Sequence, residues 1–141
     1  HQPMSVRTRA ALLAVGLEPP AHRSRQLTDV DLDAAHLVVA MEGEHVAYVR
    51  RRHPGAAPRT ATLRYLARRL RHGEEPLPVR VAELRLEELD PRQEGDVTDP
   101  AGGDEADYVA CARDLSVLMA ALMPRLAPAL SDEGAGDAAQ G

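Results

Sequence analysis

The sequence contains no phenylalanine, no tryptophan and no lysine, and it has a single cysteine. Without Phe or Trp, a hydrophobic core has to be built from Leu, Val, Ala and Met, and the hydrophobic content of 44% is enough to supply one. The lone Cys111 excludes an intrachain disulfide framework and any metal site made of several cysteines. The complete replacement of Lys by Arg indicates a GC-rich coding sequence rather than a function.

Long apolar runs are also missing. No stretch approaches the roughly 20 residues of a membrane span, and no signal peptide is recognisable, so we expect a soluble cytoplasmic protein that does not bind membranes. At 141 residues the length predicts one domain. Two basic clusters occur at residues 50–53 and 68–72, but no aromatic side chains interleave with them to stack on bases. These clusters are typical of solvated helix faces, and we expect no nucleic-acid partner.

Apolar spacing, capping residues and turn signals divide the chain into helices and strands. They predict helices over residues 5–15, 28–35, 42–52, 64–71 and 79–89, and a long C-terminal helix after Gly103. The last helix carries a continuous stripe at helical spacing, made of Tyr108, Cys111, Ala112, Leu115, Leu118, Met119 and Leu122.

Two short apolar runs predict strands that are buried on both faces, at residues 36–41 and 60–63. Strands that alternate with helices favour an α/β fold with a parallel sheet. However, a sheet of two strands is too small to stand alone, and no strand precedes the helix at 5–15. We therefore expect the first unit of the fold to be missing from this chain.

The loop at residues 96–103 leads into the long helix and holds two acids three positions apart, Asp96 and Asp99. Pro100 disfavours the α region for Asp99, so we expect an extended residue whose carboxylate projects from the loop. A carboxylic acid on a positioned loop suits proton delivery to a leaving group. Taken alone, the same residues are more typical of a simple turn ahead of a helix.

Five short segments, in order along the chain, match one known family. They are HRSRQLT at residues 22–28, LVVAME at 37–42, RTATL at 59–63, the loop at 96–103, and YVAC at 108–111. On these segments the chain resembles the low-molecular-weight protein tyrosine phosphatases, from residue 1 to about residue 126.

The resemblance implies a three-layer α/β fold, in which helices flank a parallel sheet of four strands. It also implies a protein tyrosine phosphatase that hydrolyses phosphotyrosine in protein substrates through a cysteinyl-phosphate intermediate. In that family a Cys-x5-Arg loop holds the phosphate on backbone N–H groups and supplies the nucleophile, and the Asp of an Asp-Pro motif protonates the leaving group. No metal and no cofactor is required.

Carried onto this sequence, the resemblance makes Asp99 the general acid. His22 matches a histidine that supports the phosphate loop from the second shell, although a packing or capping histidine remains an alternative. Cys111 matches a cysteine that packs within the last helix. Ala101 and Gly102 stand where many members carry two tyrosines, which puts a preference for aromatic substrates in doubt.

The sequence departs from the family at one decisive point, because it contains no Cys-x5-Arg. Position 117, six after Cys111, is Val rather than Arg. We therefore expect the first strand, phosphate loop, first helix and second strand to lie upstream of His1. Residues 1–127 would form a partial phosphatase domain, inactive by itself, and the Gly-, Ala- and acid-rich residues 128–141 a disordered tail.

Three hypotheses remain at this stage. The chain is part of a tyrosine phosphatase that is complete only in a longer form. Alternatively, it is a naturally shortened, non-catalytic relative that acts as a binding or regulatory module, with its open strand edge covered, for example by dimerisation. The third hypothesis, an arsenate reductase of similar fold, needs further redox cysteines, and residues 60–100 contain none.

Overall fold

The structure is a computed structural model that describes residues 1–127. Its elements, in chain order, are α1 (Val6–Ala14), α2 (Asp29–Ala34), β1 (Val38–Ala40), α3 (Gly43–Arg52), η1 (Pro54–Arg59), β2 (Thr60–Thr62), α4 (Leu63–Arg69), α5 (Leu77–Ala82), η2 (Leu86–Glu88), η3 (Pro91–Gln93) and α6 (Glu105–Leu126), where η marks a 3-10 turn. The expected disordered tail at 128–141 lies outside the described residues.

The two strands pair in parallel, with Val38 opposite Thr60 and Ala40 opposite Thr62. The chain crosses from β1 to β2 through α3 and η1, so the predicted α/β fold with a parallel sheet is confirmed. The described residues contain these two strands of the four that the family resemblance implies. The three-layer arrangement therefore stays a prediction.

The prediction that both strands are buried on both faces holds for β2 and is wrong for β1. All three residues of β2 are buried. In β1, the side chain of Val39 is 36% exposed, and Met41, just after the strand, is 37% exposed. The reason is that, within residues 1–127, β1 pairs only with β2 and its Val39 face is incompletely covered.

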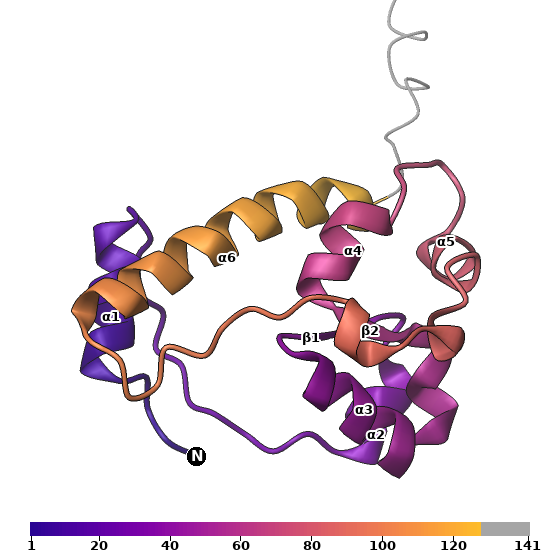
Figure 1. Cartoon of the computed structure of the whole chain (residues 1–141), viewed down its shortest axis with the longest axis horizontal. Helices are drawn as coiled ribbons and strands as arrows, with labels where there is room; N and C mark the ends of the chain where they lie inside the picture. Colours follow the sequence, from indigo (N-terminus) through magenta and orange to yellow (C-terminus); the bar gives the residue numbers. More distant parts are fainter. Residues whose placement is uncertain (128–141) are drawn as a thin grey trace, which may run out of the picture.

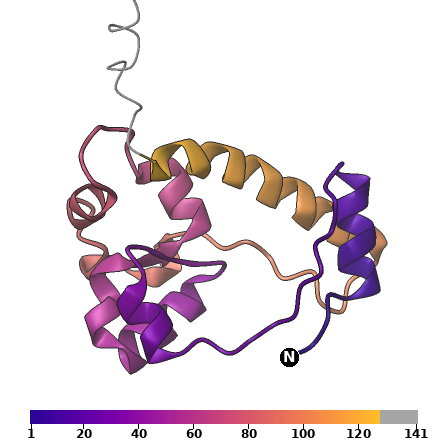
Figure 2. The ribbon, with the colours of Figure 1, turned by 180° about the vertical axis from the view of Figure 1, so that it is seen from behind.

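The long helix α6 connects two parts of the molecule (Figures 1 and 2). Its N-terminal half packs against α1, and its C-terminal half packs against α4 over the main core. The predicted apolar stripe is only partly buried: Ala112, Leu118 and Leu122 are buried, whereas Met119 is 40% exposed. The main core is formed by Ala61, Leu63, Leu66, Ala67, Leu70, Val81, Leu86, Val97, Leu118 and Leu122.

The predicted helix at 79–89 is wrong at both ends. The helix α5 begins at Leu77, behind Pro76, and ends at Ala82. Arg85 adopts a left-handed conformation with φ of +51°, which an α-helix does not tolerate. The change of direction allows Val81 and Leu86 to be buried together, at 2% and 0% exposure.

The loop between α4 and α5 is held by one arginine. Arg71 donates to Glu75 at 2.9 Å and to Glu83 at 2.8 Å. These contacts lower the pKa of Glu75 to about 2, chiefly through the hydrogen bonds from Arg71, and they also lower the pKa of Glu83. The conformation of this loop is therefore favoured when both carboxylates are ionised.

A pH dependence of stability follows from these shifts. Because the folded-state pKa of Glu75 lies below the unfolded value of 4.5, its contribution is present above pH 4.5 and is lost as the pH falls through about 2. We expect the melting temperature of Arg71→Gln to fall less than that of the parent across this window, by a small amount because the pair is exposed. Melting temperatures recorded at several pH values between 4.5 and about 2 measure this, and an equal dependence of melting temperature on pH in the two proteins would contradict it.

Candidate functional site

The loop from Glu94 to Gly103 begins at the carboxyl ends of the two parallel strands, the edge at which α/β folds bind their ligands. The Val97 N–H donates to the carbonyl of Met41 at 2.7 Å, directly after β1. The Val97 side chain is 4% exposed and belongs to the main core. This part of the loop is therefore attached to the sheet.

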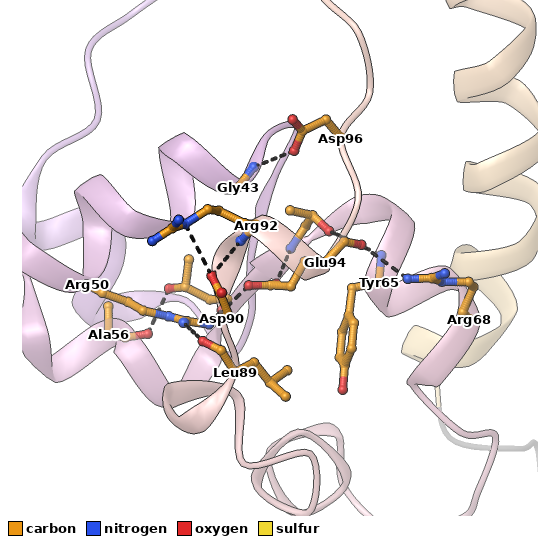
Figure 3. A network of polar contacts seen from close by, with 12 residues as sticks. Gly43, Arg50, Ala56, Tyr65, Arg68, Leu89, Asp90, Arg92, Glu94 and Asp96 are labelled. Carbon is orange, nitrogen blue, oxygen red and sulfur yellow. Dashed lines mark hydrogen bonds and ion pairs between the residues drawn. The ribbon is translucent and has the colours of Figure 1, made fainter.

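A buried carboxylate fixes the same segment to β2 (Figure 3). The side chain of Glu94 is 1% exposed; it accepts the Thr62 N–H at 3.0 Å and lies 3.3 Å from the guanidinium of Arg50. The Thr62 hydroxyl donates in turn to the Glu94 carbonyl at 3.2 Å. Burial raises the pKa of Glu94, while the Thr62 N–H and the charge of Arg50 oppose that rise. The network joins α3, β2 and the loop.

Asp96 fixes the loop to the start of α3. Its Oδ1 accepts the N–H of Gly43 at 2.7 Å (Figure 3). Its backbone carbonyl accepts the Nε of Arg64, on α4, at 3.0 Å. A carboxylate that accepts the first N–H of a helix is also favoured by the helix dipole.

Glycine is required at position 43 because the backbone of η3 passes against it. A Cβ built there would lie 2.2 Å from the carbonyl oxygen of Pro91. We expect Gly43→Ala to lower the free energy of unfolding by about 1–3 kcal/mol, since backbone would have to move. The matched control is Gly55→Ala, where a Cβ meets nothing within 4 Å. Urea denaturation measures both, and equal midpoints for the two variants would contradict this packing.

Asp99 lies at the tip of this loop, and its carboxylate is held locally. Its Oδ1 accepts the N–H of Ala101 at 2.9 Å. The Gly103 N–H donates to the carbonyl of Pro100 at 2.9 Å, and Gly102, the third residue of this turn, has a φ of +84°. Such a turn needs glycine at its third position. The side chain of Asp99 is exposed and forms part of a pocket wall.

That pocket has a volume of about 510 Å³ and opens between the loop and the first turns of α6. Its lining residues are Thr98, Asp99, Pro100, Ala101, Gly103, Asp107, Ala110, Cys111 and Asp114.

Two of the three pocket carboxylates have structural partners. Asp107 forms a capping box with Asp104 at the start of α6, and Asp114 pairs with Arg64. Asp99, by contrast, accepts the N–H of its own turn. Among the described residues, Asp99 is therefore the pocket carboxylate that neither caps α6 nor pairs with a basic side chain.

Cys111 also lines the pocket, but its chemistry does not fit a nucleophile. Burial, together with the charges of Asp114 and Asp99, raises the pKa of its thiol. The thiolate is the reactive form of cysteine, so a raised pKa makes Cys111 a poor nucleophile. This supports the assignment of Cys111 as a packing residue.

The structure does not bring His22 to the pocket. His22 is exposed and is absent from the pocket lining. Its neighbours lie against the first residues of the chain, where Ser24 N–H donates to the carbonyl of Gln2 at 2.9 Å and Pro3 forms a bridge with Arg23. A supporting role for His22 stays a prediction.

Within residues 1–127, no three His, Cys, Asp or Glu side chains gather closely enough to hold a metal ion. In the same part of the chain, each helix is too short or too polar to cross a membrane.

Comparison with known proteins gives one informative result. No protein-family model matches the chain, and no curated protein matches it. Among solved structures, the fold is similar to that of the YwlE arginine phosphatase from Geobacillus stearothermophilus, with a TM-score of 0.65 and 29% sequence identity. The match covers 86% of this chain and 64% of that protein, so the chain spans somewhat less than two thirds of the phosphatase's length. The chain thus has an α/β fold similar to that of a phosphatase, in agreement with the family resemblance of its sequence.

Proposed function

We propose that this chain supplies the general-acid loop of a protein phosphatase that works through a cysteinyl-phosphate intermediate. The observation that carries the proposal is the position of Asp99, in the wall of an open pocket between its loop and the first turns of α6, in a fold similar to that of a phosphatase. The nucleophilic cysteine and the phosphate loop come from residues outside this sequence, which contains no Cys-x5-Arg.

In the proposed reaction a thiolate attacks phosphorus, and the bond between phosphorus and the leaving atom breaks. Asp99 gives its proton to the leaving atom, so a tyrosine departs as the neutral phenol rather than as phenolate, and an arginine departs as the guanidinium cation rather than as neutral guanidine. Water then attacks the cysteinyl phosphate, and Asp99, now ionised, accepts a proton from that water. The thiolate is regenerated and inorganic phosphate is released, so atoms and charges balance over the two steps.

Two substrate classes are candidates for the phosphoprotein. Phosphotyrosine is the substrate that the sequence resemblance implies, and phosphoarginine is the one that the structural neighbour's name indicates. The pocket lining favours phosphoarginine, because it offers no aromatic side chain that would stack on a phenyl ring, and Ala101 leaves the rim small. Asp107 adds negative charge, which suits a guanidinium better than a phenol.

The test uses the full-length protein that contains this chain, with matched peptides that carry either phosphoarginine or phosphotyrosine. We expect release of inorganic phosphate, with a larger kcat/KM for the phosphoarginine peptide. A larger value for phosphotyrosine would assign the substrate that the resemblance implies. No release from either peptide would leave the non-catalytic binding or regulatory relative as the better account.

A further inference from the structure

The acid loop is attached at a point three residues before Asp99. The carboxylate of Asp96 binds the Gly43 N–H at 2.7 Å, and its carbonyl binds Arg64 at 3.0 Å. The next residue, Val97, binds the carbonyl of Met41 at 2.7 Å. Three elements, β1, α3 and α4, thus meet at this point.

Beyond this point, the loop has only local hydrogen bonds within residues 1–127 as far as Gly103. They join Asp99 to Ala101 and Pro100 to Gly103, so they define the shape of the turn but not its position in the molecule. Fixed contacts resume at the far end, where Arg7 donates to the carbonyl of Gly103. The hydrogen bonds that attach Asp99 to the rest of the molecule are therefore those at the two ends of the loop.

The attachment at Asp96 is close enough along the chain to restrict the position of Asp99. Three residues of extended chain reach at most about 10 Å, so a fixed Asp96 restricts Asp99 to a small volume beside the pocket. A general acid depends strongly on its position, because a displacement of about 1 Å can cost as much as 100-fold in rate. An anchor at Asp96 thus has a direct consequence for proton transfer.

We propose that Asp96 is a positioning residue for the general acid, which acts by clamping the Asp99 loop to the start of α3. The proposal rests on the function assigned above to Asp99. Asp96 is exposed, so its removal leaves the hydrophobic core intact, whereas Gly43, its partner, is buried and fixed. The clamp is charge-assisted, and such hydrogen bonds are about twice as strong as neutral ones.

The first measurement uses the full-length protein that contains this chain and needs no enzymatic activity. Backbone ¹⁵N relaxation reports the order of residues 97–103 in the parent, in Asp96→Ala and in Asp96→Asn. We expect Asp96→Ala to lower the order parameters of this segment while those of α6 stay unchanged. Asn keeps an acceptor oxygen, so Asp96→Asn should retain most of the order. The matched control, Asp33→Ala, removes an exposed acid from α2 and should change nothing in the loop.

The second measurement uses the full-length protein and two aryl phosphates. Phenyl phosphate has a poor leaving group that needs a proton, whereas 2,4-dinitrophenyl phosphate leaves readily as an anion. We expect Asp96→Ala to lower kcat for phenyl phosphate about 10-fold or more and to change that for the dinitrophenyl ester less than about twofold. A merely structural role would lower both rates together. Asp96→Asn, which keeps an acceptor oxygen, should have a kcat for phenyl phosphate close to that of the parent.

The outcomes separate the two proposals. Unchanged loop order in Asp96→Ala would overturn the clamp, and so would equal losses for the two esters. Reduced loop order, with no hydrolysis of either ester by the unmodified full-length protein, would uphold the clamp and overturn the phosphatase assignment. Should Asp96→Ala fail to fold, Asp96→Glu tests the same point, since it keeps the charge beside α3 but lengthens the clamp by one methylene; unchanged order and an unchanged rate ratio in that variant would also overturn the proposal.

Discussion

Replacing Asp99 with asparagine in the full-length protein is expected to slow the hydrolysis of phenyl phosphate by about 100-fold or more, the usual size of a general-acid contribution. Asparagine can still accept the Ala101 N–H, so the turn that presents the side chain should persist. It has no proton to give, however, and the phenolate has to leave as an anion. Steady-state kcat measures the loss.

Two controls make this result specific. Hydrolysis of 2,4-dinitrophenyl phosphate should change little, because its leaving group is stable without a proton. Asp107→Asn, which alters another carboxylate of the same pocket, should leave both rates near those of the parent, because neither aryl phosphate carries the guanidinium that the charge of Asp107 would favour. The alkaline limb of the pH–rate profile should also disappear in Asp99→Asn, since it reports the catalytic acid. Comparable losses in the Asp99 and Asp107 variants would refute a specific role for Asp99.

Glu94→Ala is expected to be the most destabilising substitution in the loop, at about 3–5 kcal/mol. The change leaves the guanidinium of Arg50 without its carboxylate, and it leaves the N–H of Thr62 without its acceptor. Both partners are largely shielded from water, so neither loss is recovered by solvent. The midpoint of urea unfolding, together with its slope, measures the effect.

The control for this prediction is an exposed pair of the same chemistry. Glu88 pairs with Arg85 on the surface, where the two side chains are 54% and 69% exposed. Glu88→Ala should therefore cost less than about 1 kcal/mol. Glu94→Gln keeps an acceptor for Thr62 and should fall between the two. If Glu94→Ala were as stable as Glu88→Ala, the buried network would not stabilise the fold as described.

The elements that the sequence predicts well are those with local signals. Thr28 caps α2 with a capping box to Asp31, and Gly16 follows α1 with a φ of +80°. The helix at 79–89 fails because tertiary burial of Leu86 overrides a helical pattern, through a left-handed Arg85. The exposure of Val39 could not be read from an apolar run, since burial depends on what covers the strand.

The candidate site also contains residues that local sequence signals predict and residues that only the fold reveals. Asp99 is recognisable from its Asp-Pro pair and from the order of the matching segments around it. The contacts of Asp96 with Gly43 and of Glu94 with Thr62 join residues 53 and 32 positions apart. No periodicity or motif within a polar stretch indicates such partners. Glu94 in particular resembles any surface glutamate until the fold shows it to be buried.

The coding sequence that precedes the codon for His1 tests the central claim most directly, because the proposed chemistry needs a nucleophile that this chain lacks. We predict an open frame, continuous with this chain, that encodes an apolar strand followed by Cys-x5-Arg. Such a segment would hold the phosphate of the substrate, and Asp99 would protonate the leaving group. An in-frame stop codon, or an unrelated sequence, would contradict the phosphatase assignment and identify the chain as a non-catalytic relative.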